Sequence, residues 1–133
     1  MISGRRAALL AMTTAALAAP VVLATPASAA TWDHSMSTND SDPGGRVQFR
    51  VDGDRFRLCD IEADGWKVNL RIWDEYDAVV DESSVGTNGN CVERVATEFG
   101  VRSLRDGRYY TFEIWLSKSG TSYAYADEAT WKA

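Results

Sequence analysis

The sequence predicts an all-β domain, a Greek-key β-sandwich of about seven strands, and three observations support this prediction. Apolar and polar residues alternate with a period of two in several segments after residue 45, which is typical of strands with one buried face. Turn residues such as Asp52-Gly53-Asp54 separate these segments. No segment after residue 29 has a sustained helical period. A small β-barrel is the alternative architecture that this pattern allows.

The first 29 residues have the order of a removable export signal. Arg5 and Arg6 precede an almost uncharged run over residues 7–25, and Pro26-Ala27-Ser28-Ala29 provides small residues for cleavage after Ala29. The arginine pair also leaves the twin-arginine export route open. No later segment is long and apolar enough to span a membrane. We therefore expect a secreted, extracellular protein that is not held in a membrane after signal removal.

The residues after the signal have the size and charge of one small acidic domain. Without residues 1–29 the chain has 104 residues, and 12 Lys and Arg stand against 19 Asp and Glu, a formal charge of −7. Such a charge repels phosphate backbones, so nucleic acid is not expected as a partner. We expect a monomer without a cofactor. Residues 30–45 are polar and rich in turn residues, which predicts a flexible N-terminal arm or a loosely docked first strand, and residues 46–133 form the predicted sandwich.

Three strands are expected directly after the arm. They cover residues 46–51, 55–61 and 66–73, and in each of them apolar residues occupy alternate positions, such as Val47 and Phe49 in the first. Short turns separate them, so the sequence predicts that the three strands form a meander.

The second half of the chain is less regular. Residues 74–90 are acidic and then small and polar, which predicts a long connection with a short strand at 78–80. Further strands are expected at 91–97 and from Tyr109 onward, and a last pair at 121–126 and 129–131.

The chain has two cysteines, Cys59 and Cys91. In an exported protein such a pair predicts a disulfide, across the core or at an edge of the sandwich. Closing this loop stabilises the fold by roughly 3–4 kcal/mol in the chain-entropy estimate. A zinc site is disfavoured because the one histidine, His34, lies far away in the sequence.

A Leu-x-x-Gly-x-x-Tyr pattern at Leu104, Gly107 and Tyr110 precedes the strand that contains Phe112 and Ile114. This spacing is that of the tyrosine corner found in immunoglobulin-like and fibronectin-like sandwiches, where the tyrosine hydroxyl bonds back to the backbone of the corner. The pattern narrows the predicted fold to an immunoglobulin- or fibronectin-like sandwich.

The segment Gly53-Asp54-x-Phe56, followed by Asp60-x-x-Ala63-Asp64-Gly65, occurs together with the cysteine pair and the Tyr-Thr-Phe-Glu-Ile-Trp strand. It resembles the small secreted β-domain proteins of actinomycetes, a group that is largely uncharacterised. The resemblance covers about half of the chain after the signal and implies a source and a compartment. It implies no activity.

No catalytic or metal-binding constellation stands out, so we expect no enzymatic activity and no metal. His34 lies in the polar arm and lacks the packing that a catalytic base requires. Asp60-x-Glu62-x-Asp64-Gly65 is similar to the start of an EF-hand loop, but Arg71 occupies the position of the bidentate glutamate. A loose calcium site formed by Asp33, Asp40 and Asp42 is the remaining metal alternative.

The most informative candidate residues are aromatic. If Val68, Leu70 and Ile72 face the core, Arg71 and Trp73 face outward, and by the same alternation Tyr109, Glu113 and Trp115 face outward on a later strand. Exposed indoles among polar partners suit stacking on sugar rings. The sequence therefore predicts a non-catalytic binding module for an extracellular polysaccharide, with Trp73, Trp115, Tyr109, Arg71 and Glu113 as candidate ligand-binding residues. In the opposing interpretation the two indoles simply pack.

A second hypothesis belongs to another class. The Ser/Gly/Asn-rich stretch 81–90 directly precedes Cys91, and a disulfide beside a loop would pre-organise it for docking. The chain would then be a structural or protein-interaction domain, inhibitor-like or surface-associated, with a secreted or surface protein as its partner.

Overall fold

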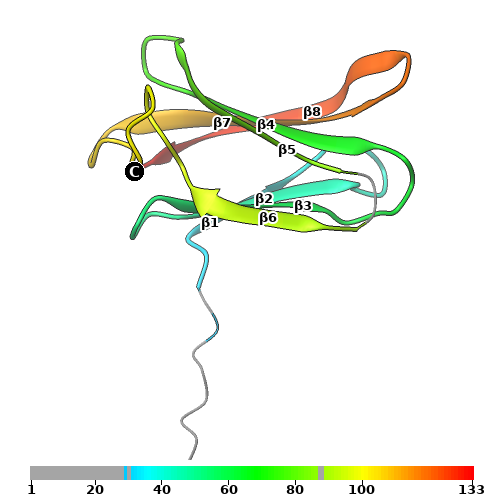
Figure 1. The fold of residues 1–133 in the computed structure, drawn as a ribbon, viewed down its shortest axis with the longest axis horizontal. Helices are drawn as coiled ribbons and strands as arrows, with labels where there is room; N and C mark the ends of the chain where they lie inside the picture. Colours follow the sequence, from blue (N-terminus) through cyan, green and yellow to red (C-terminus); the bar gives the residue numbers. More distant parts are fainter. Residues whose placement is uncertain (1–28, 30, 87–88) are drawn as a thin grey trace, which may run out of the picture.

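The computed structural model describes residues 29, 31–86 and 89–133, so the predicted signal lies almost entirely outside the described residues. Over these residues the chain forms eight strands and no helices (Figure 1). The first antiparallel sheet has the order β1-β2-β3-β6, and the second has the order β5-β4-β7-β8. The strands are β1 (His34–Ser37), β2 (Gly45–Arg50), β3 (Arg55–Asp60), β4 (Lys67–Trp73), β5 (Val79–Val85), β6 (Cys91–Val95), β7 (Tyr109–Lys118) and β8 (Thr121–Lys132).

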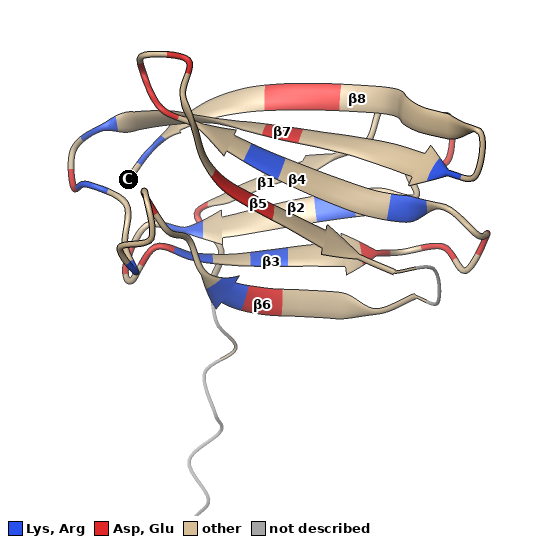
Figure 2. Cartoon of the chain, turned by 45° about the horizontal axis from the view of Figure 1, so that its top comes forward, with Lys and Arg blue, Asp and Glu red and all other residues tan. Residues whose placement is uncertain are grey.

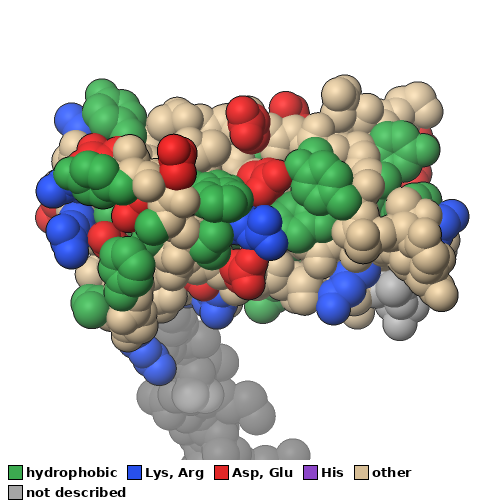
Figure 3. Space-filling view, turned by 90° about the horizontal axis from the view of Figure 1, so that it is seen from above, with side chains coloured by type: hydrophobic (Ala, Val, Ile, Leu, Met, Phe, Trp, Pro, Cys, Tyr) green, Lys and Arg blue, Asp and Glu red, His purple; other side chains and the backbone are tan. Residues whose placement is uncertain are grey.

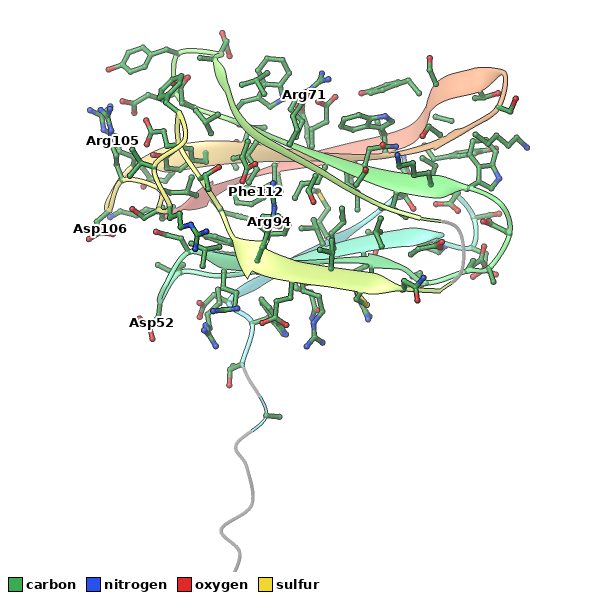
Figure 4. The ribbon with its side chains drawn as sticks, in the orientation of Figure 1. Asp52, Arg71, Arg94, Arg105, Asp106 and Phe112 are labelled. Carbon is green, nitrogen blue, oxygen red and sulfur yellow. A yellow bond between two sulfur atoms is a disulfide. The ribbon has the colours of Figure 1, made fainter. Side chains whose placement is uncertain are left out.

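The two sheets lie face to face as the layers of a sandwich (Figure 1). The alternating apolar residues of β2 and β3 meet those of β4 and β7, and Phe112 points into the space between the layers (Figure 4). The side chains of this core that are almost completely buried include Val47, Phe49, Phe56, Leu58, Val68, Leu70, Ile72, Ala96, Tyr110, Phe112, Ile114 and Leu116. The predicted β-sandwich is confirmed, and the sheets do not close into the barrel that was the alternative.

The predicted meander of the first three strands is wrong. β2 pairs with β3, but β4 lies in the opposite sheet, and the second neighbour of β3 is β6. Residues 61–66 connect the two sheets in place of a tight hairpin, and Trp66 at their end packs against the core. Alternation alone shows which side of a strand is buried, but it does not show which sheet the strand joins. The crossover from β3 to β4 and the return to β6 create the Greek-key arrangement.

Two further strands differ from their predicted extent. The short strand expected at 78–80 is the seven-residue strand β5, Val79–Val85. Its pattern was hidden because the polar residue Asp81 occupies a buried position, where it pairs with Arg94 of β6. The strand pair expected at 121–126 and 129–131 is the single strand β8. Register shifts along β8 interrupt its alternation and explain the apparent break.

The segment 30–45, for which the sequence allowed a flexible arm or a docked first strand, contains β1. This strand pairs antiparallel with β2, with His34 opposite Phe49. Met36 is buried, and the ring of His34 stacks on Trp131 of β8 at a centroid distance of 5.0 Å. The sandwich therefore includes residues 34–37 in addition to the strands after residue 45.

Cys59 and Cys91 form the predicted disulfide. The two residues lie directly opposite each other on neighbouring strands, β3 and β6. Since β6 is the last strand of its sheet, the bond fastens an edge strand and lies within one sheet, not across the core. No helix in the described part of the chain is long and apolar enough to cross a membrane.

The tyrosine corner predicted at Leu104, Gly107 and Tyr110 is present. The backbone N–H of Arg105 donates a hydrogen bond of 2.9 Å to the Tyr110 hydroxyl, which in turn donates one of 2.7 Å to the buried Glu98 carboxylate. Burial and the hydrogen bond to Glu98 raise the pKa of Tyr110 to about 12. The corner fixes the loop between β6 and β7 against the start of β7.

Candidate functional site

The outer face of the second sheet carries most of the residues that the sequence predicted. On β4 and β7 every second side chain faces outward, and the strand register sets Arg71 opposite Glu113 and Asn69 opposite Trp115. On the other flank Arg71 lies opposite Glu82 of β5. Figure 3 views this face and shows hydrophobic side chains among charged ones of both signs. Trp73 and Trp115 are each partly exposed.

Arg71 connects the two tryptophans. Its guanidinium carbon lies 5.4 Å from the ring of Trp73 and 5.1 Å from the ring of Trp115, within the range of cation–π attraction. The ring of Tyr123 on β8 lies 5.6 Å from that of Trp115. Trp73, Arg71, Trp115 and Tyr123 therefore form one continuous row across three strands, which we call the aromatic ridge.

Two glutamates hold the ridge in place. Glu113 accepts hydrogen bonds from Nε1 of Trp73 at 3.2 Å and from the hydroxyl of Tyr123 at 2.6 Å. The hydrogen bond to Glu113 raises the pKa of Tyr123. Glu82 forms an ion pair with Arg71, with 2.8 Å between Nε and Oε1. The ridge side chains are thus fixed by polar contacts within the sheet face, as a preorganised binding surface requires.

A shallow groove of about 450 Å³ runs beside the ridge. Trp115 and Arg71 line it together with polar residues of β4 and β5, which are Asn69, Glu82, Ser83 and Ser84. Of the two serines, Ser84 lies on the outer face opposite Asn69, whereas Ser83 lies opposite the buried Leu70. Two further hollows lie on the same face, one beside Tyr123, Asp127 and Glu128 and one beside Trp73 and Glu128. The face therefore offers an aromatic wall with hydrogen-bonding groups on both sides.

The charge of this face is mixed, with an acidic excess. Figure 2 shows acidic positions on β5, β7 and β8 around a basic position on β4. Glu82 and Glu113 flank Arg71, while Asp127 and Glu128 make no ion pair with any described residue.

Tyr109 does not join the other predicted site residues. It faces outward at the start of β7, but it lines a separate pocket at the end of the sandwich, together with Tyr76 and Phe99. The other four predicted residues lie together, because Trp73, Trp115 and Arg71 belong to the ridge and Glu113 binds two of its side chains.

Sequence reasoning missed Tyr123 and the polar residues of β5. On β8, Ala129 and Trp131 pack against the core, so uninterrupted alternation would turn Tyr123 inward as well. A register shift between Ile114 and Leu116 of β7 reverses this alternation, and Tyr125, with φ of 53°, adopts a left-handed conformation there. Tyr123 then faces outward, and no local sequence signal predicts such a shift.

Half of the stretch 81–90, which the second hypothesis took as a loop, belongs to a strand. Residues 81–85 belong to β5, and 87–88 lie outside the described residues. No three or more His, Cys, Asp or Glu side chains among the described residues are grouped so that they could hold a metal ion. Asp40, one of the three residues of the alternative calcium site, accepts hydrogen bonds from the Thr38 hydroxyl and the Gly44 N–H.

Comparisons of the chain with protein-family models, curated proteins and solved structures gave no match. The geometry of the site and the sequence are therefore the basis for the function proposed below.

Proposed function

We propose that this chain is a secreted, non-catalytic binding module that engages an extracellular polysaccharide through the outer face of the second sheet. One observation carries the proposal: the partly exposed indole of Trp115 forms a wall of the groove that Asn69, Ser83 and Ser84 also line. The disulfide between Cys59 and Cys91 is compatible with an extracellular location.

The chemistry of the groove matches that of a sugar chain. Sugar rings have apolar C–H faces and polar hydroxyl edges, and binding sites for such ligands combine apolar walls with a few placed polar groups. Here the Trp115 indole provides the wall, and Asn69 and Ser84, which the strand register places on the same face, lie beside it. The Arg71–Glu82 ion pair adds a hydrogen-bond donor and an acceptor to the same groove.

The shape and charge of the face also narrow the polymer class. The groove is open and shallow and two further hollows continue the face, which suits an extended chain better than a compact ligand. Glu82, Glu113, Asp127 and Glu128 line this surface, so a polyanion would be repelled. We therefore assign the site to a polysaccharide without acidic groups.

The proposal is tested by depletion of the purified domain, residues 30–133, from solution by insoluble cellulose, chitin, xylan and β-1,3-glucan. Saturable binding to one of these polymers is expected, and alginate, an acidic polymer, should not compete. Asn69→Ala, which keeps the ridge, should weaken binding several-fold. Binding to none of the polymers, or equal binding by the Asn69→Ala variant, would overturn the proposal.

A further inference from the structure

The outer face of the second sheet has two parts that differ in charge. The groove beside Trp115 contains the Arg71–Glu82 ion pair, so its two charges balance. The other two hollows of this face have volumes of about 230 and 410 Å³ and share Glu128 of β8. We call them the acidic hollows, because every charged side chain that lines them is a carboxylate. These are Glu113, Asp127 and Glu128 in the first and Asp77 and Glu128 in the second.

The carboxylates of the acidic hollows have no cationic partner in the part of the chain that the structure describes. None of the four takes part in an ion pair between described residues. Glu113 lies opposite Arg71 in the strand register, but Arg71 pairs with Glu82 on its other flank. Lys132, the basic residue of β8, ends that strand opposite Tyr109. The free domain therefore leaves a concentrated negative charge on this part of the face.

The strand register increases the repulsion within the first hollow. It sets Glu113 of β7 directly opposite Glu128 of β8, and Figure 2 shows the acidic positions of these two strands side by side. Like charges at directly opposite positions destabilise a sheet, and Asp127 adds a third negative charge to the same hollow. A hydrogen bond to Glu113, burial, and the charges of Glu113 and Glu128 raise the pKa of Tyr123, which also lines it. A bound cation would relieve this repulsion.

The cation that fits these hollows is a protonated amine. The first hollow is lined by Tyr123 and the second by Trp73, and aromatic rings attract ammonium groups through cation–π interactions. Both hollows continue the face from the groove at Trp115, where the aromatic wall suits a sugar ring. A small amine would fill one hollow, whereas a sugar polymer with amines on successive units can reach both hollows and the groove.

We propose that the polysaccharide bound by this face carries free amino groups, and that its protonated amines lie against Glu113, Asp127 and Glu128. This inference rests on the proposed function, because it names the chemical class of the same ligand. It goes beyond the exclusion of acidic polymers, since it distinguishes an amino sugar from its neutral, acetylated counterpart.

Two oligosaccharides that differ only in the acetyl group test the inference, the β-1,4-linked hexamers of glucosamine and of N-acetylglucosamine. Calorimetric titration is done at about pH 5.5, where carboxylic acids and amines of ordinary pKa are both charged. The glucosamine hexamer should bind at least tenfold more tightly, and added salt should reduce this preference.

Glu128→Gln should remove most of the preference for the glucosamine hexamer. It also removes the repulsion with Glu113, so it should not lower the midpoint of urea unfolding, and a lost preference then cannot be attributed to misfolding. Asp52→Asn, which removes one charge from the turn between β2 and β3 in the other sheet, is the control for net charge and should keep the preference.

Equal affinity for the two hexamers, or a preference that persists in Glu128→Gln, overturns the inference. In that case the proposed function stands if the acetylated hexamer or one of the insoluble polymers binds, whereas both proposals fall if no saccharide binds. Hexalysine is the third ligand to titrate. If it binds as tightly as the glucosamine hexamer and is weakened equally by Glu128→Gln, the acidic hollows serve a basic peptide and the assignment to an amino sugar is overturned.

Discussion

The guanidinium of Arg71 lies over the indole ring of Trp115, with its carbon 5.1 Å from the ring centroid. The same group lies over Trp73 and forms an ion pair with Glu82. Arg71 is therefore the residue that joins two neighbouring strands into one surface. This arrangement combines the two interpretations that the sequence left open, because the indoles pack against a cation and still reach solvent.

Arg71→Met should remove the cation–π contacts and keep most of the side-chain volume. We expect a loss of roughly 1–2 kcal/mol in the free energy of unfolding, because each contact contributes about 0.5–1 kcal/mol at a partly exposed site. Urea unfolding followed by tryptophan fluorescence measures this loss, and acrylamide should quench the variant more strongly than the unaltered domain. Lys67→Met, at the exposed start of the same strand, is the matched control. If both variants have the same free energy of unfolding, Arg71 does not stabilise the aromatic ridge.

Tyr110→Phe should destabilise the domain by about 1–3 kcal/mol, since it leaves the buried Glu98 carboxylate and the Arg105 N–H without their partner. Thermal and urea unfolding check this prediction. Tyr109→Phe provides the control, because Tyr109 is adjacent but exposed, and its effect should stay below about 0.5 kcal/mol. If Tyr110→Phe changes the free energy of unfolding as little as the control does, the tyrosine corner does not stabilise the domain.

The stability of the domain should fall as the pH rises from about 4.5 to about 7. A hydrogen bond with Asp42 raises the pKa of Glu62 from 4.5 to about 7, and burial raises the pKa of Asp54. A carboxyl group with a raised pKa in the folded state binds its proton more tightly there than in the unfolded chain, so its stabilising effect is complete at low pH and is lost through this range. Urea unfolding at several pH values measures the slope.

Glu62→Gln should flatten the upper part of this profile, because the amide can donate to Asp42 without titrating. Glu62 is partly exposed, so the effect should be largest at low ionic strength. An unchanged profile in the variant would show that Glu62 and Asp42 do not share a proton.

Replacing both cysteines by alanine should lower the free energy of unfolding by about 3–4 kcal/mol, the value expected for a loop closed over 32 residues. Because the bond fastens the edge strand β6, amide hydrogen exchange in Cys91–Val95 should increase more than in β4 or β7. Uniform acceleration over both sheets would contradict the local role assigned to the disulfide.

The features that depend on neighbouring residues within one strand or one turn could be predicted from the sequence. Alternation in 66–73 and 109–116 placed Arg71, Trp73, Glu113 and Trp115 outward, and the spacing from Leu104 to Tyr110 indicated the corner. Both are properties of a single strand or turn, and they depend on side chains within a few residues of each other.

The remaining features depend on contacts between segments distant in the sequence. The strand expected at 78–80 was predicted too short because the buried Asp81 is satisfied by Arg94, a residue of another strand. The position of β4 in the second sheet depends on how the apolar faces of the two sheets together form the core. The tight turn over Phe99 and Gly100, both of which have positive φ, was missed because phenylalanine is disfavoured at such a position.

The central claim, that the outer face of the second sheet binds a polysaccharide, is tested most directly by a binding isotherm on the polymer that depletes the domain best. Trp115→Ala should lose at least tenfold in affinity, since it removes the aromatic wall of the groove. Phe99→Asn, altered at the separate pocket beside Tyr109, should bind like the unaltered domain. Equal affinity of Trp115→Ala and the unaltered domain, with both folded, would contradict the claim.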